Sequence, residues 1–240
     1  MKIGICAVFF LSFLIGCAPV GGTLAKKVPM QIEAFPSQGN LSNASESQEL
    51  DPETERIITS YGSTIRKYSA NYGFDWRFIL AVMKQESRFA PHAESHRGAS
   101  GFMQMMPRTS AEVARALRIE DMARPKNNIR GGIYYLSRLC RLFEQSEESD
   151  RLKLALAAYN AGLSRVQDAQ ELAQYLDADP VQWSSVKDAL PFLSKRYYTL
   201  HQNVWQQEKP KSGWFGNSRE TVAYVESIMS YYDEYRTVLN

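Results

Sequence analysis

Apolar residues recur at helical spacing over most of the chain after residue 53. The first such segment puts five apolar side chains on one face of a helix, namely Ile57, Ile58, Tyr61, Ile65 and Tyr68. Tyr72-Gly73 predicts where this helix ends. The same pattern predicts further helices at about 75–87, 107–117, 128–143, 152–161, 166–176, 191–206 and 219–239. No segment alternates in the manner of a β-strand, so the predicted fold class is all-α.

The N-terminus follows a different pattern, in which Met1-Lys2 precedes an almost unbroken apolar run over residues 3–15. This run is shorter than the roughly 20 apolar residues that a membrane-spanning helix requires. A cationic start, an apolar stretch and then small residues are typical of a secretory signal peptide. The run ends in Leu14-Ile15-Gly16-Cys17, which resembles the bacterial lipobox. A buried hydrophobic helix is the alternative interpretation.

The lipobox resemblance implies that residues 1–16 are removed and that Cys17 becomes a lipid-modified N-terminus. The protein would then be an envelope lipoprotein that faces the periplasm, and Ala18 after the cysteine favours the outer membrane. Residues 17–52 would form the lipidated start and a flexible tether, because small and polar residues dominate there without a period. Residues 53–240 remain as a single helical domain.

Composition narrows the possible ligands only slightly. Apolar residues make up 44% and charged residues 22% of the 240 positions, as in an ordinary globular protein. The formal charge of +2 and the scattered Lys and Arg residues give no reason to expect nucleic acid as a partner. The three histidines lack the spacing of metal ligands, so we predict no metal site and no cofactor. Cys140 has a helical context that predicts a small, buried and unreactive side chain.

One carboxyl group lies on a helix face that is predicted to be buried. Ile79, Val82, Met83 and Glu86 are spaced by three or four residues, so the helix that buries the first three directs Glu86 inward. Charged side chains are rarely buried without a reason. Loss of hydration raises the pKa of such a carboxyl toward values suited to a general acid. The alternative is a glutamate at a helix end that reaches water or pairs with a neighbouring Lys or Arg.

The segment after this helix, residues 88–106, is predicted to be a loop rich in Gly, Ser and Ala. Gly98 and Gly101 permit tight turns that bring the backbone close to a ligand. Ser95 and Gln104 would supply hydrogen bonds within such a loop, while Phe102 and Met103 offer apolar walls. A purely structural loop with methionines in the core is the alternative.

A third motif, residues 157–162, reads Ala-Ala-Tyr-Asn-Ala-Gly. Tyr159 continues an apolar stripe that begins at Leu152, so its side chain is predicted to face inward. A buried tyrosine hydroxyl needs a hydrogen-bond partner, and a carboxyl group of the same site is one candidate. Gly162 as a helix terminator gives a structural explanation of the same motif.

These motifs, in this order, resemble the catalytic domain of soluble-type (SLT) lytic transglycosylases, a goose-lysozyme-like helical fold. The matching stretches are Glu-Ser, Gly-Ala-x-Gly-Phe-Met-Gln-x-Met-Pro and Ala-Tyr-Asn-Ala-Gly. The resemblance implies that Glu86 is the single catalytic acid and that Ser95 holds it. It also implies a sugar-binding cleft lined by Gln104, Tyr159 and Asn160, with Met103 as an apolar wall. Phe102 departs from the usual Leu of this motif.

The last third of the chain resembles the membrane-bound transglycosylase F type over residues 190–198 and 219–226. On that alignment Glu220 and Tyr224 join the substrate site, and Tyr224 contacts the catalytic glutamate. An ordinary amphipathic helix is the alternative interpretation of this stretch. Residues 53–240 are therefore predicted to be a lytic transglycosylase domain that acts on peptidoglycan strands and is tied to a membrane through Cys17.

The family's chemistry implies that Glu86 protonates the oxygen leaving N-acetylmuramic acid and then takes the proton of that sugar's 6-hydroxyl, which closes a 1,6-anhydro ring. Two alternatives stay open. A goose-type hydrolytic lysozyme would share the fold and activate water with a second acid, for which Glu94 and Glu112 are candidates. A non-catalytic, peptidoglycan-binding envelope lipoprotein is the other.

Overall fold

The computed structural model describes residues 50–239. The predicted signal peptide, the predicted lipidation site Cys17 and the predicted tether up to residue 49 lie outside the described residues, as does Asn240. The regular elements of the described residues are helices, which confirms the all-α class. None of these helices is long and apolar enough to cross a membrane.

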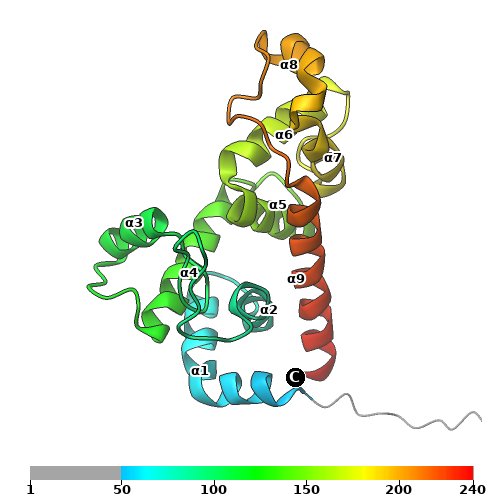
Figure 1. Ribbon diagram of the computed structural model, residues 1–240. Coiled ribbons are helices and arrows are strands. Elements are labelled where there is room, and N and C mark those ends of the chain that lie inside the picture. The colour runs from blue at the N-terminus through cyan, green and yellow to red at the C-terminus, as the bar shows by residue number, and fades with distance from the viewer. Residues whose placement is uncertain (1–49, 240) are drawn as a thin grey trace, which may run out of the picture. The chain divides into compact units, whose positions relative to one another are not determined.

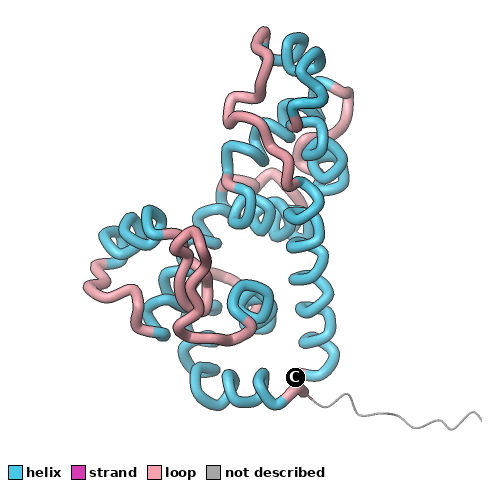
Figure 2. Tube along the Cα trace, in the orientation of Figure 1, coloured by secondary structure: helices cyan, strands magenta, loops and turns pink. Residues whose placement is uncertain are grey.

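Residues 50–239 form nine α-helices and two short 3₁₀ helices, η1 and η2, which Figures 1 and 2 show in the same orientation. In chain order they are α1 Pro52–Asn71, α2 Trp76–Ser87, α3 Pro107–Leu117, α4 Pro125–Arg141, α5 Glu148–Ala161, α6 Leu163–Tyr175, α7 Trp183–Ala189, η1 Leu190–Leu193, η2 Lys195–Tyr197, α8 Tyr198–Trp205 and α9 Ser218–Val238.

Aspartates fix the starts of the first two helices. Asp51 accepts a hydrogen bond from the Thr54 backbone N–H at 2.9 Å, and Asp75 accepts one from the Arg77 backbone N–H at 2.9 Å. Each bond satisfies a backbone donor that has no partner inside its helix. Asp75 is thus the N-cap of α2, which occupies the predicted residues.

Several helices begin earlier than the apolar pattern predicts. The helix expected from residue 128 begins at Pro125, because proline is well tolerated in the first turn. The helix expected from residue 152 begins at Glu148, and its first turn carries Glu148 and Asp150. Acidic residues favour a helix N-terminus, but they lie outside the apolar stripe by which the sequence identifies a helix.

The prediction of one continuous helix over residues 191–206 is wrong. Two 3₁₀ helices occupy its first part, and α8 begins only at Tyr198. The break lies at Ser194, whose extended backbone, with a ψ of 156°, separates the two 3₁₀ helices. The sequence pattern also misses α7, whose seven residues are too few to establish a helical period.

Helix α2 lies at the centre of its neighbours, between α4 and α9 in Figure 1. Six consecutive residues, 78–83, are at most 1% exposed, so α2 is buried on every side and not only along one stripe. A helix that is apolar all round belongs in a protein interior. Because α2 packs closely against α9 and also contacts α1, its C-terminal residues are held where several elements meet.

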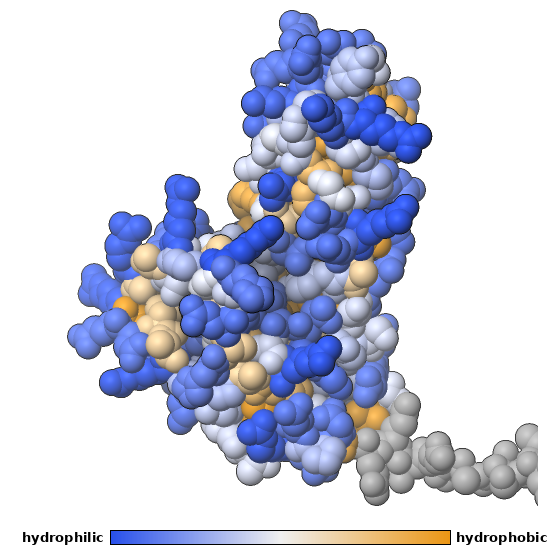
Figure 3. Space-filling view, viewed as in Figure 1, coloured by the Kyte–Doolittle hydropathy of each residue, from blue (hydrophilic) through white to orange (hydrophobic). Residues whose placement is uncertain are grey.

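Helix α5 contacts helices that come both before and after it in the chain. It packs against α4 on one side, against α6 and α7 on the other, and along α9. The buried apolar side chains form one continuous cluster from α1 to α9. The face seen in Figure 3 is mainly hydrophilic, and the apolar residues on it form small, separate groups.

Candidate active site

Glu86 lies in the last turn of α2 and reaches α9. Its Oε1 accepts a hydrogen bond from the Tyr224 hydroxyl at 2.5 Å. Tyr224 is 7% exposed, and Glu86 is partly buried. Burial raises the pKa of Glu86 to about 7, while the bond from Tyr224 opposes this increase. The carboxyl therefore exchanges its proton near neutral pH, which is what a general acid requires.

The surroundings of Glu86 offer no stabilising cation among the described residues. Burial and the Tyr224 bond account for its pKa without a contribution from any charged side chain. Lys84, a basic neighbour in the sequence, pairs with Asp51 at 3.1 Å instead. The C-terminal end of a helix also disfavours a negative charge. Glu86 is thus neither ion-paired nor freely hydrated.

The loop between α2 and α3 turns sharply at two glycines, as the sequence predicts. Gly98 has a φ of +79° and Gly101 a φ of +77°. A Cβ atom at Gly101 would lie 2.5 Å from the side chain of Asn128, so glycine is required there for close packing as well as for its backbone angle. The loop can therefore pass directly over α4.

Polar side chains fix this loop next to Glu86. The Asn128 Oδ1 accepts a hydrogen bond from the Met103 backbone N–H at 2.9 Å, and its Nδ2 donates to the Ser100 carbonyl at 3.1 Å. Ser87, next to Glu86, donates from Oγ to the Phe102 carbonyl at 3.0 Å. Because Asn128 is 1% exposed and both ends of its amide are used, it is a rigid support for the loop.

Tyr159 and Met103 form the next contact. The Tyr159 hydroxyl donates to the Met103 backbone carbonyl at 2.6 Å, and not to a carboxyl group. Burial and the nearby Glu86 raise the pKa of Tyr159 well above its usual value, so its hydroxyl stays neutral. The Met103 side chain is fully buried and packs where Gly132 leaves space. Its side chain is therefore part of the core in this structure, and it supports Tyr159 through its backbone.

The two polar side chains predicted in the loop also make local hydrogen bonds. The Ser95 Oγ accepts from the Ala99 backbone N–H at 3.0 Å, so it shapes the turn and makes no bond to Glu86. The Gln104 Nε2 donates to the carbonyls of Ala93 and Gly101, each at 3.0 Å. The backbone of Gln104 itself has a positive φ of +41°. Both side chains stabilise the loop conformation directly.

The remaining predicted residues lie at the junction of α5 and α9. Asn160, the residue after Tyr159, is exposed, and its Oδ1 accepts a hydrogen bond from the Thr221 hydroxyl at 2.9 Å. Glu220 is exposed and accepts a bond from Asn217 at 2.9 Å. Tyr224 lies one turn further along α9 and contacts Glu86, as the sequence alignment implies.

Neither candidate for a second catalytic acid shares a hydrogen bond with Glu86. Glu112 pairs with Arg138 at 2.6 Å, and this pairing lowers the pKa of Glu112. It is about half exposed on α3. Glu94 is exposed in the loop, where its backbone bridges Ser100. Among the carboxyl groups of residues 50–239 in this site, Glu86 is the one whose pKa is strongly raised.

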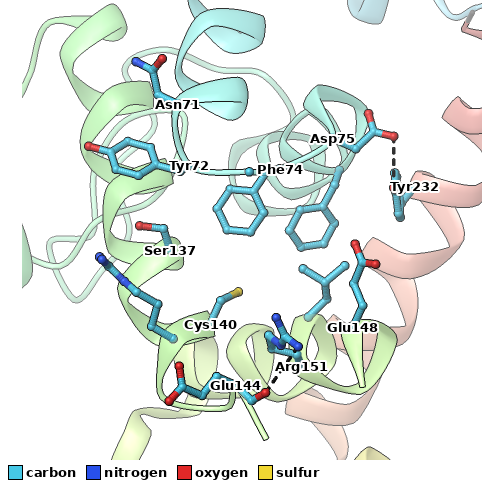
Figure 4. A pocket seen from close by; sticks show the side chains of 14 residues that line it. Asn71, Tyr72, Phe74, Asp75, Ser137, Cys140, Glu144, Glu148, Arg151 and Tyr232 are labelled. Atoms are coloured by element: carbon cyan, nitrogen blue, oxygen red, sulfur yellow. Dashed lines mark hydrogen bonds between the residues drawn. The ribbon is translucent and has the colours of Figure 1, made fainter. Parts of the chain in front are cut away.

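A separate cavity of about 530 Å³ lies at the other end of α2 (Figure 4). Its lining includes Phe74, Asp75, Cys140 and Tyr232, but not Glu86. Burial raises the pKa of Cys140 to about 12, so its thiol remains protonated and unreactive, as predicted. Within residues 50–239, His, Cys, Asp and Glu side chains form no group of three that could hold a metal ion.

Two further residues shape the site without being recognisable in the sequence, Asn128 and Thr221. Each is polar and at most 1% exposed, and each bonds to a segment distant in the sequence. A buried polar residue on a helix is recognisable from sequence only when its burial can be predicted. Their partners lie 25 and 61 residues away, so spacing along the chain gave no signal.

An all-helical domain that holds one titrating carboxyl beside tyrosines and a glycine-rich loop is typical of the lysozyme-like class of proteins. Residues 63–181 match the family model described as the transglycosylase SLT domain. Through this domain the chain belongs to the transglycosylase SLT family. The predicted resemblance is thereby confirmed.

Relatives named membrane-bound lytic murein transglycosylase F cover most of the described chain. The protein of Desulfosudis oleivorans is 37% identical over 183 residues, which are 75% of this chain and 37% of that protein. The protein of Shewanella pealeana is 38% identical over 177 residues, which are 73% of this chain and 34% of that protein. The chain thus spans about a third of the length of these relatives.

Solved structures agree with the fold. The 70 kDa soluble lytic transglycosylase of Escherichia coli superposes with a TM-score of 0.54 at 23% identity, over 78% of this chain and 26% of that chain. An inactive Glu-to-Gln mutant of the lytic transglycosylase Slt of Pseudomonas aeruginosa superposes with a TM-score of 0.53 at 27% identity, over 80% and 27% of the two chains.

Proposed function

We propose that this protein is a peptidoglycan lytic transglycosylase that cleaves the β-1,4 bond between N-acetylmuramic acid and N-acetylglucosamine without consuming water. The observation that carries the proposal is the environment of Glu86. This carboxyl is partly buried, has a pKa of about 7 and is held by the neutral hydroxyl of Tyr224. Membership of the SLT family and an inactive Glu-to-Gln mutant of a structural neighbour support the same assignment.

In the proposed reaction, protonated Glu86 donates its proton to the glycosidic oxygen as the bond to the anomeric carbon breaks. The resulting carboxylate then removes the proton of the 6-hydroxyl of N-acetylmuramic acid. That oxygen bonds to the anomeric carbon and closes a 1,6-anhydro ring. Glu86 ends the cycle protonated, so one group with a pKa near the working pH serves first as acid and then as base.

A second carboxylate is not needed for this chemistry. Ordinary glycosidases use two carboxylates, one as acid and one as base or nucleophile. A hydroxyl within the same sugar, once aligned, reaches effective molarities on the order of 10⁵ M or more and therefore outcompetes water. The ion pair between Glu112 and Arg138 supports this view, because it keeps that carboxylate engaged elsewhere.

The test is digestion of purified peptidoglycan in ¹⁸O-labelled water, followed by mass analysis of the glycan ends. We expect 1,6-anhydro ends without label. Labelled reducing ends would overturn the proposal in favour of a hydrolytic lysozyme. Glu86→Gln should release no detectable product. Glu94→Gln and Glu112→Gln serve as matched controls and should still form the 1,6-anhydro product. Cleavage that persists in Glu86→Gln would remove Glu86 from the mechanism.

We further propose that the protein is an envelope lipoprotein, in which the segment between Cys17 and Leu50 tethers the helical domain to the outer membrane through lipid on Cys17. The predicted boundary at residue 53 moves to about residue 50, because Asp51 caps α1. The lipobox-like sequence supports this, as do relatives named membrane-bound transglycosylases. Membrane fractionation of Cys17→Ala tests the anchor. The variant should move to the soluble periplasmic fraction, and continued sedimentation with outer membranes would contradict lipid anchoring.

A further inference from the structure

The side-chain amide of Asn160 is held in one orientation by a residue of α9. The Thr221 Oγ1 donates to the Asn160 Oδ1 at 2.9 Å. The Asn217 carbonyl oxygen, a second possible acceptor, lies 3.5 Å from the Thr221 Oγ1. A threonine hydroxyl has one proton, and the shorter distance assigns that proton to Asn160. The amide oxygen of Asn160 is therefore directed toward Thr221 by a hydrogen bond within the protein.

This bond determines what Asn160 presents to its surroundings. With its oxygen turned toward Thr221, the amide has its NH₂ on the opposite side, and this NH₂ donates to no acceptor among residues 50–239, although Asn160 as a whole is exposed. An Asn amide rotated by half a turn would present the carbonyl oxygen instead and would bind donors rather than acceptors. The Thr221 hydroxyl thus selects a donating surface at this position.

The location of this pair links it to Glu86. Asn160 follows Tyr159 on α5, and Thr221 precedes Tyr224 by three residues on α9, so both α9 side chains lie on one face. Thr221 is 1% exposed, whereas Asn160 is exposed. One face of α9 therefore orients the acid through Tyr224 and the neighbouring amide through Thr221.

We propose that Thr221 is a positioning residue that fixes the Asn160 amide so that its N–H donors bind an acceptor oxygen of the glycan strand. This inference rests on the proposed glycan-cleaving function. Without the Thr221 hydroxyl, the donating orientation loses the net free energy of one hydrogen bond, and the substrate must supply that free energy to hold the amide in place. Substrate binding should weaken, while the proton transfers of Glu86 should continue at nearly the same rate.

The test compares Thr221→Val, which keeps the shape of threonine, with Thr221→Ser, which keeps the hydroxyl. Initial rates of 1,6-anhydro product release from soluble peptidoglycan strands give KM and kcat. Thr221→Val should raise KM about fivefold, the factor that corresponds to one net hydrogen bond, and change kcat less than about twofold. Thr221→Ser should restore KM to within about twofold of the unaltered protein.

A double-mutant cycle separates positioning from general packing. If Thr221 acts through the amide, Thr221→Val should raise KM no further in an Asn160→Ala background. Equal effects in both backgrounds would overturn the proposal, as would an unchanged KM in the single variant. Absence of anhydro products from the unaltered protein would instead refute the proposed function, so the two failures are distinguishable.

Discussion

Two carboxyl groups at opposite ends of α2 each accept a hydrogen bond from a tyrosine of α9, yet their pKa values shift in opposite directions. Asp75 accepts a bond from Tyr232 at 3.1 Å, and Glu86 accepts one from Tyr224 at 2.5 Å. The pKa of Asp75 is lowered, whereas the pKa of Glu86 is raised to about 7. The tyrosine bond alone therefore does not set the protonation state.

The other neighbours explain the difference. Burial is the largest influence at both sites and raises the pKa of each carboxyl. At Asp75, the guanidinium of Arg77 at 2.8 Å and the Arg77 backbone N–H at 2.9 Å outweigh burial. The helix N-terminus also favours the negative charge. At Glu86 only a neutral hydroxyl opposes burial, so the same helix holds one ionised carboxylate and one that titrates.

Substitution of Glu86 should have the largest effect, and comparison with Asp75 distinguishes the roles of the two carboxyl groups in activity. Glu86→Gln should lower kcat for anhydro product formation by about a thousandfold or more, because the acid and base steps both lose their group. Asp75→Asn should leave kcat within about threefold, because Asp75 is at the far end of α2 and is held in structural contacts. A comparable loss in both variants would show that the Glu86 effect is structural.

The pH dependence of stability should have opposite signs at the two sites. The raised pKa of Glu86 means that its burial costs little at pH 5 and destabilises the fold as pH rises through 7. The stability of Glu86→Gln relative to the unaltered protein should therefore increase by roughly 2–3 kcal/mol between pH 5 and pH 8. Urea unfolding at both pH values measures this change.

Asp75→Asn provides the opposite case in the same unfolding experiment. The lowered pKa of Asp75 gives stability that is present above the usual carboxyl pKa and is lost as pH falls through its folded value. The destabilisation caused by Asp75→Asn should therefore be complete at neutral pH and diminish in acid. The same pH trend in both variants would contradict the contrast between the two ends of α2.

Removing the hydroxyl that faces Glu86 should have a smaller effect. Tyr224→Phe should reduce kcat/KM about tenfold, through loss of a hydrogen bond to a charged group. Because that bond lowers the pKa of Glu86, its removal should also move the alkaline decline of kcat/KM to higher pH. A pH–rate profile of the variant measures both quantities, and a decline that moved to lower pH would refute the assignment.

The matching change at the other end of α2 should be the mildest. Tyr232→Phe removes the 3.1 Å bond to Asp75, which retains its contacts with Arg77. We expect a loss of about 1 kcal/mol or less in the free energy of unfolding and no shift of the pH–rate profile. A shift in that profile would show that the two ends of α2 are coupled.

The sequence was sufficient for the elements that rest on local rules. The Asp75 cap, the extent of α2 and the positive φ angles of Gly98 and Gly101 follow from residue type and position. The inward direction of Glu86 was predicted from one apolar stripe, although α2 is in fact buried all round. Long-range packing, and not periodicity, makes this helix central, so the prediction understated the burial of its other faces.

The detailed contacts of the site could not be predicted in the same way. The sequence suggested a carboxyl partner for Tyr159, and the structure gives it the Met103 carbonyl instead. The family resemblance implies that Ser95 holds Glu86, but Ser95 bonds within its own turn, as its place in the loop predicts. Each hydrogen bond depends on ångström-scale placement of segments far apart in the chain. A motif identifies the residues that gather, but not which donor meets which acceptor.

The central claim is that Glu86 is a poorly hydrated carboxyl that titrates near neutral pH. It is tested most directly by ¹³C NMR of glutamate carboxyl groups between pH 3 and 9, with the resonance assigned by its absence in Glu86→Gln. We predict one glutamate carboxyl, missing from the variant, with a pKa near 7. A Glu86 resonance that titrates near 4.5, like that of a fully hydrated glutamate, would contradict the account.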